Sequence, residues 1–182
     1  LEGKNLIEIA GIWGSTGPEV VIDLLAAEGG AVSMVVFAMC EEDVRHVMRQ
    51  PFVMVGSDGS ALAPAGVLGK GKPHPRNYGT FPRVLGHYAR DEAVLPLEDA
   101  VRKMTSLPAR RLGLTDRGML VPGMGADITV FNPATVIDRA TFTDPHQYPA
   151  GIEYVVVNGR IVVERGEHMH VLAGRVLRKR PA

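Results

Sequence analysis

Two short valine-rich runs between helical segments constrain the fold of this chain most strongly. Residues 31–38 are nearly continuous in apolar side chains, and residues 53–55 form a second apolar run. Such runs are typical of strands buried on both faces of a sheet. The segments around them, residues 5–13, 19–28 and 41–50, have the apolar spacing and the end signals of helices. This alternation predicts an α/β fold with parallel strands and crossover helices.

The predicted structure changes to β after residue 120. Further helices are expected at residues 81–90 and 97–105 and in a short segment that ends at Gly113, and strands are expected at residues 127–131, 154–158 and 161–164. The last two strands are joined at Asn158-Gly159, a strong hairpin signal. We therefore expect an α/β part over residues 1–119 and an all-β part over residues 120–182.

The composition excludes some classes of partner. Among 182 residues, 46% are apolar and 22% are charged, and the formal net charge is zero. This balance gives no electrostatic reason to bind nucleic acid or an anionic membrane. No apolar run approaches the roughly 18 residues of a membrane span. The single cysteine, Cys40, predicts a reducing, cytoplasmic location. The chain begins at Leu1 without a methionine, which suggests a trimmed or partial product.

One carboxylate follows the second apolar run directly. Asp58 stands in a Gly-Ser-Asp-Gly turn, where α/β folds place catalytic groups at the carboxyl ends of strands. It is either a turn residue that caps its own loop or a general base and acid beside a metal-bound water. The segment after it, residues 59–80, is rich in Gly, Pro and Ala and is predicted to be a long functional loop.

Other candidate residues keep two interpretations each. Arg76 has a planar fork suited to a substrate carboxylate, or it is a solvated loop residue. The neighbouring His74 is a ligand, a donor or a plain loop residue. His168 and His170 have a metal-ligand spacing, but their polar surroundings favour exposed surface histidines. Cys40 precedes a predicted helix, where a small buried or capping role is favoured over a reactive thiolate.

Four segments, taken in order, resemble the N-acyl-D-amino-acid deacylases (D-aminoacylases) of the amidohydrolase superfamily. The segments are Val-Gly-Ser-Asp-Gly at 55–59, Gly-Lys-Pro-His-Pro-Arg-Asn-Tyr-Gly-Thr-Phe-Pro-Arg at 71–83, Lys-Met-Thr-Ser-Leu-Pro-Ala-Arg-Arg-Leu-Gly-Leu at 103–114, and Gly-Ala-Asp-Ile-Thr-Val-Phe at 125–131 with the Val-Asn-Gly hairpin at 157–159. The His-Pro-Arg to Phe-Pro-Arg run, joined to the upstream Ser-Asp-Gly, is the most specific of these motifs. The Gly-Ala-Asp element is shared by many amidohydrolases.

The resemblance implies a partial (β/α)₈ metal-dependent hydrolase barrel, with residues 53–55 as its last strand, followed by the C-terminal strands of a small β-sandwich. It implies that Asp58 is the catalytic aspartate close to zinc. In that family a zinc-bound hydroxide attacks the acyl carbonyl and the aspartate carries the proton to the leaving amine. It also implies that Arg76 binds the α-carboxylate of the D-amino acid and that Met39 forms an apolar wall of the substrate pocket.

The zinc ligands of this family lie on earlier barrel strands that have no counterpart in this chain. We therefore expect a C-terminal piece of a deacylase, inactive by itself and without bound zinc. Its unpaired strands predict self-association or pairing with a missing N-terminal part. Two alternatives are a non-catalytic assembly or binding domain and one subunit of a split amidohydrolase.

Overall fold

The computed structural model describes residues 1–178, so residues 179–182 of the expected all-β part lie outside the described region. The elements in chain order are α1 (Leu6–Trp13), α2 (Gly17–Ala27), α3 (Glu41–Arg49), the 3₁₀ turn η1 (Gly66–Gly69), α4 (Arg76–Arg83), the π-helix η2 (Val84–Asp91), α5 (Leu97–Met104), α6 (Ser106–Leu112), β1 (Ile128–Phe131), β2 (Ile152–Val157), β3 (Arg160–Glu164) and β4 (Glu167–His168). Within the described residues, no helix has the length and apolar character needed to cross a membrane.

Apart from the helix predicted at residues 81–90, the predicted helices are confirmed with small shifts at their ends, because their start and stop signals are local. The side chain of Asn5 accepts the N–H of Glu8 (3.0 Å), and the Glu8 carboxylate accepts the N–H of Asn5 (2.8 Å) at the start of α1. The helix ends at Gly14, whose φ of 64° is left-handed. Gly113 ends α6 in the same way, with a φ of 72°.

One helix begins earlier than predicted. The chain turns into α4 at Arg76, inside the segment 59–80 that was expected to be a loop throughout. The Nδ1 atom of His74 accepts the N–H of Arg76 (3.0 Å), so a side chain satisfies one of the free donors at this helix start. Arg76 therefore lies on the first turn of a helix rather than on a loop.

The two predicted buried strands are not strands in this structure. Residues 31–38 form an extended, largely exposed connection between α2 and α3, and residues 53–55 are extended, with Val53 and Val55 half-buried and Met54 exposed. The N–H of Val55 donates to the carbonyl of Lys103 (3.2 Å), and no ladder follows. A strand needs a neighbouring strand for its backbone groups, and among residues 1–178 the sheet contains only β1 to β4. The described residues by themselves therefore do not form these two strands, because the sequence pattern does not supply a partner strand.

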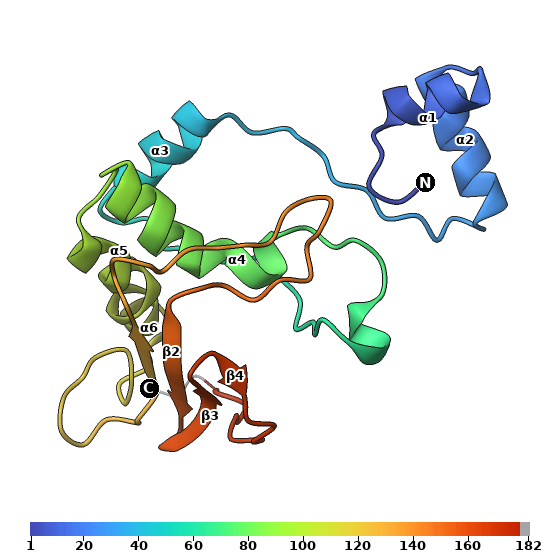
Figure 1. The fold of residues 1–182 in the computed structure, drawn as a ribbon. Helices are drawn as coiled ribbons and strands as arrows, with labels where there is room; N and C mark the ends of the chain where they lie inside the picture. Colours follow the sequence, from blue (N-terminus) through green and yellow to red (C-terminus); the bar gives the residue numbers. More distant parts are fainter. Residues whose placement is uncertain (179–182) are drawn as a thin grey trace.

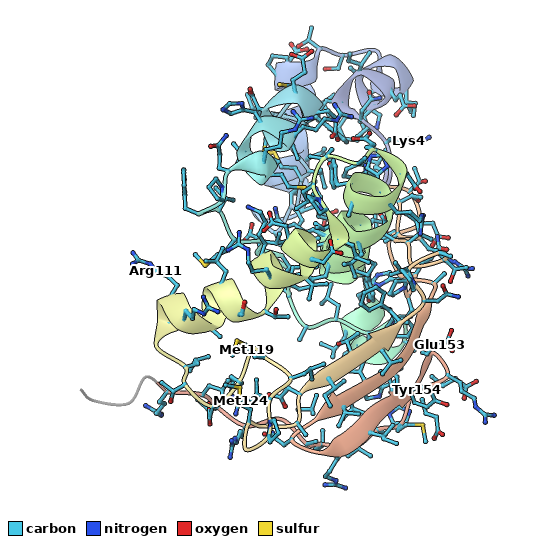
Figure 2. All side chains as sticks on the ribbon, turned by 90° about the vertical axis from the view of Figure 1, so that its left-hand side faces the viewer. Lys4, Arg111, Met119, Met124, Glu153 and Tyr154 are labelled. Carbon is cyan, nitrogen blue, oxygen red and sulfur yellow. The ribbon has the colours of Figure 1, made fainter. Side chains whose placement is uncertain are left out.

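The three strands predicted in the second part are confirmed, with small shifts at their ends. The four strands β1, β2, β3 and β4 lie in this order in one antiparallel sheet. Asn158 and Gly159 join β2 to β3 with positive φ angles of 49° and 77°, as a two-residue hairpin requires. Figure 2 shows Glu153 and Tyr154 on β2 and places Met119 and Met124 on the connection between α6 and the sheet.

The core lies where the helices meet the connection between β1 and β2. Its buried side chains are Val84, Leu85, Tyr88, Val94, Leu95, Ala100 and Val136. Gly86 of η2 has no room for a side chain, because a Cβ there would lie 2.2 Å from the carbonyl oxygen of Val136. The absence of a side chain at Gly86 allows η2 to pack directly against the connection between β1 and β2. In Figure 1 the pair α1 and α2 stands apart from this body, beyond the extended connection.

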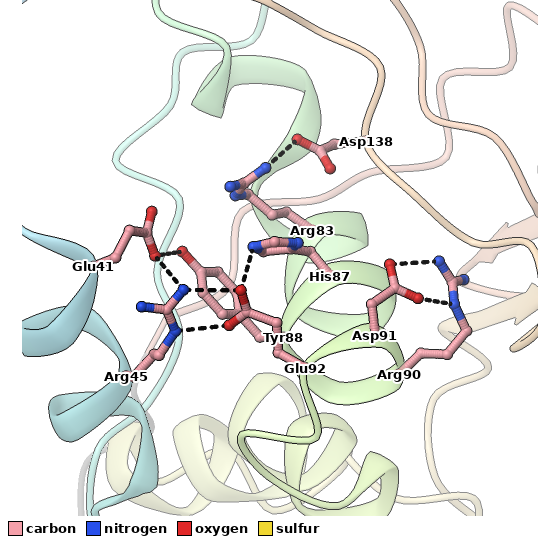
Figure 3. Close-up of polar contacts among 9 residues, drawn as sticks. All are labelled: Glu41, Arg45, Arg83, His87, Tyr88, Arg90, Asp91, Glu92 and Asp138. Carbon is pink, nitrogen blue, oxygen red and sulfur yellow. Dashed lines mark hydrogen bonds and ion pairs between the residues drawn. The ribbon is translucent and has the colours of Figure 1, made fainter.

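A polar network joins α3 to η2 (Figure 3). Arg45 donates from Nε and Nη2 to the Glu92 carboxylate, at 2.7 and 2.8 Å. Nε2 of His87 lies 3.2 Å from the same carboxylate. The hydroxyl of Tyr88 donates to Glu41 (2.9 Å). Residues 50–57, which lead to Asp58, directly follow α3. By holding α3 against η2, the network therefore holds the start of this segment.

Candidate functional site

Asp58 and Arg76, which the sequence singled out separately, form an ion pair. Asp58 Oδ2 lies 2.9 Å from Arg76 Nη2, and their side chains are 85% and 44% exposed. Asp58 ends the extended segment in a left-handed conformation, with a φ of 47°. This conformation is uncommon for a residue with a side chain, although Asp tolerates it better than most. The structure thus brings together one carboxylate and one guanidinium at an open surface.

A second contact joins the two segments that carry this pair. Asn77 Oδ1 accepts the N–H of Ser60 (2.6 Å), and Asn77 Nδ2 donates to the carbonyl of His74 (2.7 Å). Gly59 lies close to the backbone of Arg76 and Asn77. A Cβ at this position would stand 3.1 Å from Asn77 Cα and 3.2 Å from the carbonyl oxygen of Arg76. Sequence reasoning missed Asn77, because an asparagine in a Pro-rich segment has no distinctive signal.

His74 is half-buried beside this pair. Burial, and then the neighbouring Arg76 guanidinium, lower the pKa of the His74 imidazole below its ordinary value. A neutral imidazole agrees with its Nδ1 atom accepting the N–H of Arg76. His74 therefore acts as an acceptor that holds the start of α4.

Aromatic side chains from distant segments surround the same helix start. The ring of Phe142 lies edge-on to His74 (5.1 Å between centroids) and to Phe37 (4.7 Å). The Tyr78 hydroxyl lies 2.8 Å from His146 Nδ1, and His146 Nε2 lies 3.1 Å from the carbonyl oxygen of Gly71. Burial, and then the nearby Tyr148, raise the pKa of Tyr78. Residues 141–148, which sequence reasoning did not assign to the site, thus brace it from the β part.

Met39 does not form a pocket wall in this structure. Its side chain is 85% exposed on the connection between α2 and α3. Phe37, two residues earlier, is the residue of this connection that touches the site through Phe142. The expected role of Met39 stays a prediction, because the connection has no partner strand here to turn its side chains inward.

The described residues do not fit a zinc site. Within residues 1–178 no three His, Cys, Asp or Glu side chains gather closely enough to hold a metal ion, whereas zinc sites use at least three protein ligands. His168 and His170 lie near each other, with ring centroids 5.1 Å apart, and both are exposed. Cys40 is exposed at the start of α3. The histidine pair is thus a surface feature, as the sequence indicated.

The comparisons with known proteins agree with the motifs. D-aminoacylase of Alcaligenes xylosoxydans xylosoxydans is 46% identical over 182 residues, which are 100% of this chain and 35% of that protein. A crystal structure of D-aminoacylase, described as defining a novel subset of amidohydrolases, matches with a TM-score of 0.79 and 44% identity over 95% of this chain and 34% of that one.

A second solved structure is also similar. It is N-acyl-D-glutamate deacylase from Bordetella bronchiseptica, complexed with zinc and a phosphonate inhibitor. Its TM-score is 0.73 at 42% identity, over 87% of this chain and 31% of that one. The chain spans about a third of the length of these relatives. The model of the amidohydrolase family matches residues 23–163, which are most of this chain. The chain therefore belongs to the amidohydrolase family.

Proposed function

We propose that this chain supplies the catalytic aspartate and the carboxylate-binding arginine of an enzyme that hydrolyses the amide bond of N-acyl-D-amino acids. The observation that carries the proposal is the pairing of Asp58 with Arg76 at 2.9 Å, within motifs that resemble those of the deacylases. The 46% identity to D-aminoacylase over the whole chain supports it.

The two side chains divide the work. Asp58 accepts a proton from the attacking water and gives it to the nitrogen of the leaving amine, while the new C–O bond replaces the C–N bond. The products are a carboxylic acid and a D-amino acid. Arg76 binds the α-carboxylate of the substrate. Its guanidinium has five N–H donors, so it can hold Asp58 and still present further donors to the substrate.

In this proposal the ligands of the zinc ion lie outside the described residues. The related deacylase from Bordetella bronchiseptica is complexed with zinc, but residues 1–178 contain no group of three possible ligands. We infer that zinc in the assembled enzyme is bound by another stretch of polypeptide, and that Asp58 lies near it.

Assembly completes the fold in this proposal. Met34 and Phe37, in the connection that sequence predicted as a strand, are 81% and 76% exposed. Such a surface favours self-association or pairing with another polypeptide segment. In the assembled enzyme residues 31–38 and 53–55 become the last strands of a barrel over residues 1–119, and residues 120–182 join a β-sandwich. Met39 then faces the substrate.

An assembly experiment tests the proposal. The chain alone is expected to show no turnover, and mixing it with the part of a D-aminoacylase that it does not cover is expected to produce a complex that hydrolyses N-acyl-D-amino acids. Sedimentation measures the complex, and release of D-amino acid measures turnover. A complex without turnover would leave the chain as a non-catalytic assembly domain.

Variants of the assembled enzyme separate the two roles. Asp58→Ala is expected to lower kcat by about 10²- to 10⁴-fold, the range of a lost general acid and base. Arg76→Ala is expected to raise KM for carboxylate-bearing substrates by about 10- to 100-fold, because a charge-assisted hydrogen bond is lost. Asp43→Ala and Arg49→Ala, at exposed positions on α3, are the controls. An unchanged KM in Arg76→Ala would refute its role.

A further inference from the structure

The ion pair between Asp58 and Arg76 is too exposed to hold together the two chain segments that carry these residues. Both side chains are substantially exposed, at 85% and 44%, and exposed ion pairs contribute little to stability. Asp58 lies at the end of an extended segment and Arg76 at the start of α4. Another contact must fix the separation of these two backbones if the pair is to keep one geometry.

Asn77 provides that contact with both ends of its side-chain amide. Its oxygen accepts the N–H of Ser60 at 2.6 Å, and its nitrogen donates to the carbonyl of His74 at 2.7 Å. Ser60 lies two residues after Asp58, and Asn77 directly follows Arg76. A carboxylate could make the first bond but not the second, and an aliphatic side chain could make neither.

Gly59 allows the two backbones to approach. A Cβ there would lie 3.1 Å from Asn77 Cα, 3.2 Å from the Arg76 carbonyl oxygen and 3.4 Å from Asn77 Oδ1. The chain around Gly59 is therefore in contact with the first turn of α4, and the Ser60 N–H is directed to the amide oxygen. Two independent features, one polar and one steric, place the same two segments together.

We propose that Asn77 is the positioning residue that holds Asp58 and Arg76 at their working separation. The relevance to catalysis rests on the proposed deacylase function, whereas the coupling itself is a property of this chain. The two hydrogen bonds of the Asn77 side-chain amide go to backbone groups of Ser60 and His74, so its effect on the ion pair passes through those backbones.

Hydrogen exchange and NMR of the full chain test the coupling without any turnover. In Asn77→Leu the Ser60 amide is expected to exchange about tenfold faster or more, because its acceptor is lost. In Asn77→Asp, which keeps an acceptor, the Ser60 amide is expected to stay protected. The Arg76 Nε signal in Asn77→Leu is expected to move to its position in Asp58→Asn, where the ion pair is broken.

Two comparisons keep the test decisive. Asn132→Leu is the matched control, since Asn132 Oδ1 accepts the N–H of Ala134 at 2.9 Å away from this site, and it should leave the Ser60 and Arg76 signals unchanged. If Asn77→Leu fails to fold, Gly59→Ala pushes the same backbones apart and should produce the same two changes.

The result that overturns the proposal is a folded Asn77→Leu chain with an unchanged Ser60 exchange rate and an unchanged Arg76 signal. In the assembled enzyme, Asn77→Leu should lower kcat and raise KM together, unlike Arg76→Ala, which chiefly raises KM. Absence of turnover in the assembled wild-type enzyme would remove the proposed function, and the NMR signals would still decide the coupling.

Discussion

Residues 1–40 and residues 41–164 contain similar apolar side chains but bury them differently. In the first region Ile9 (4% exposed) and Val20 (0%) are buried, whereas most other apolar side chains are not: Ile7 is 84% exposed and Met39 is 85% exposed. In the second region Val84 is 3% exposed and Ala100 is fully buried. The first region is an isolated pair of helices and an extended connection (Figure 1), whereas the second closes a core between helices and a sheet. An apolar pattern therefore specifies a buried face only where a second surface is present to cover it.

The largest expected effect comes from breaking the closed core at Gly86. In Gly86→Ala the new Cβ would meet the Val136 carbonyl oxygen at 2.2 Å and Ile137 Cδ1 at 2.8 Å. We expect a loss of about 3 kcal/mol, at the upper end for overpacking. Urea unfolding followed by circular dichroism measures it.

The control for Gly86 lies in the first region. Gly11→Ala on α1 meets no atom within 4 Å and should gain at most about 1 kcal/mol of local helix stability. The single tryptophan, Trp13, ends α1 and reports this region by fluorescence. If Gly86→Ala shifted the Trp13 transition as much as the circular dichroism, the two regions would unfold as one unit and the comparison would fail.

A smaller effect is expected from the buried lysine of the second region. Lys103 is 0% exposed, and its ammonium donates to the carbonyls of Gln50 and of Val53, the latter at 3.1 Å. Lys103→Met leaves these carbonyls without that donor, and we expect a loss of about 2 kcal/mol in urea unfolding. Lys70→Met, at an exposed position, should change little. Equal stability of the two variants would show that water replaces the ammonium.

The smallest effect concerns the polar link of α3 to η2, and it depends on pH. The hydrogen bonds from Arg45 lower the pKa of Glu92 below its ordinary value of 4.5. A carboxylate with a lowered pKa adds stability above the unfolded-state pKa and loses it as the pH falls through the folded-state pKa. The stability difference between wild type and Arg45→Ala should therefore be present at pH 7 and shrink below about pH 4.5.

Thermal unfolding across this pH range measures the difference, with Arg49→Ala at the exposed end of α3 as control. Added salt should reduce the difference, because the pair is partly exposed. A difference that is constant from pH 3 to pH 7 would mean that Arg45 contributes by packing rather than by its charge.

The parts of the fold that sequence predicted correctly depend on short-range chemistry. The helix predicted at residues 5–13, which the structure caps with Asn5 and Glu8, the helix end at Gly113 and the hairpin at Asn158-Gly159 each depend on residues close together in the sequence. The start of α4 at Arg76 was missed, because the side chain that satisfies it, His74, lies in a segment whose prolines indicate a loop.

The sequence singled out two residues of the candidate site but not their contact. Asp58 and Arg76 were both identified from their motifs, and their pairing at 2.9 Å is a property of the folded chain. Asn77 was not identified as a site residue, because an asparagine in a Pro-rich segment has no distinctive signal and its partner Ser60 is distant in the sequence. Phe142 and His146 were missed because they reach the site from the β part.

The family motifs, most helix ends and the antiparallel hairpin can be predicted from the amino-acid sequence, because those features depend on residue types at short spacing. The conformation of residues 31–38 and 53–55 depends on the folded chain, since these residues have the pattern of strands and form none among the described residues. The contact between Asp58 and Arg76 likewise exists only after folding. A strand and an ion pair each require a second partner, and local sequence does not say where that partner lies.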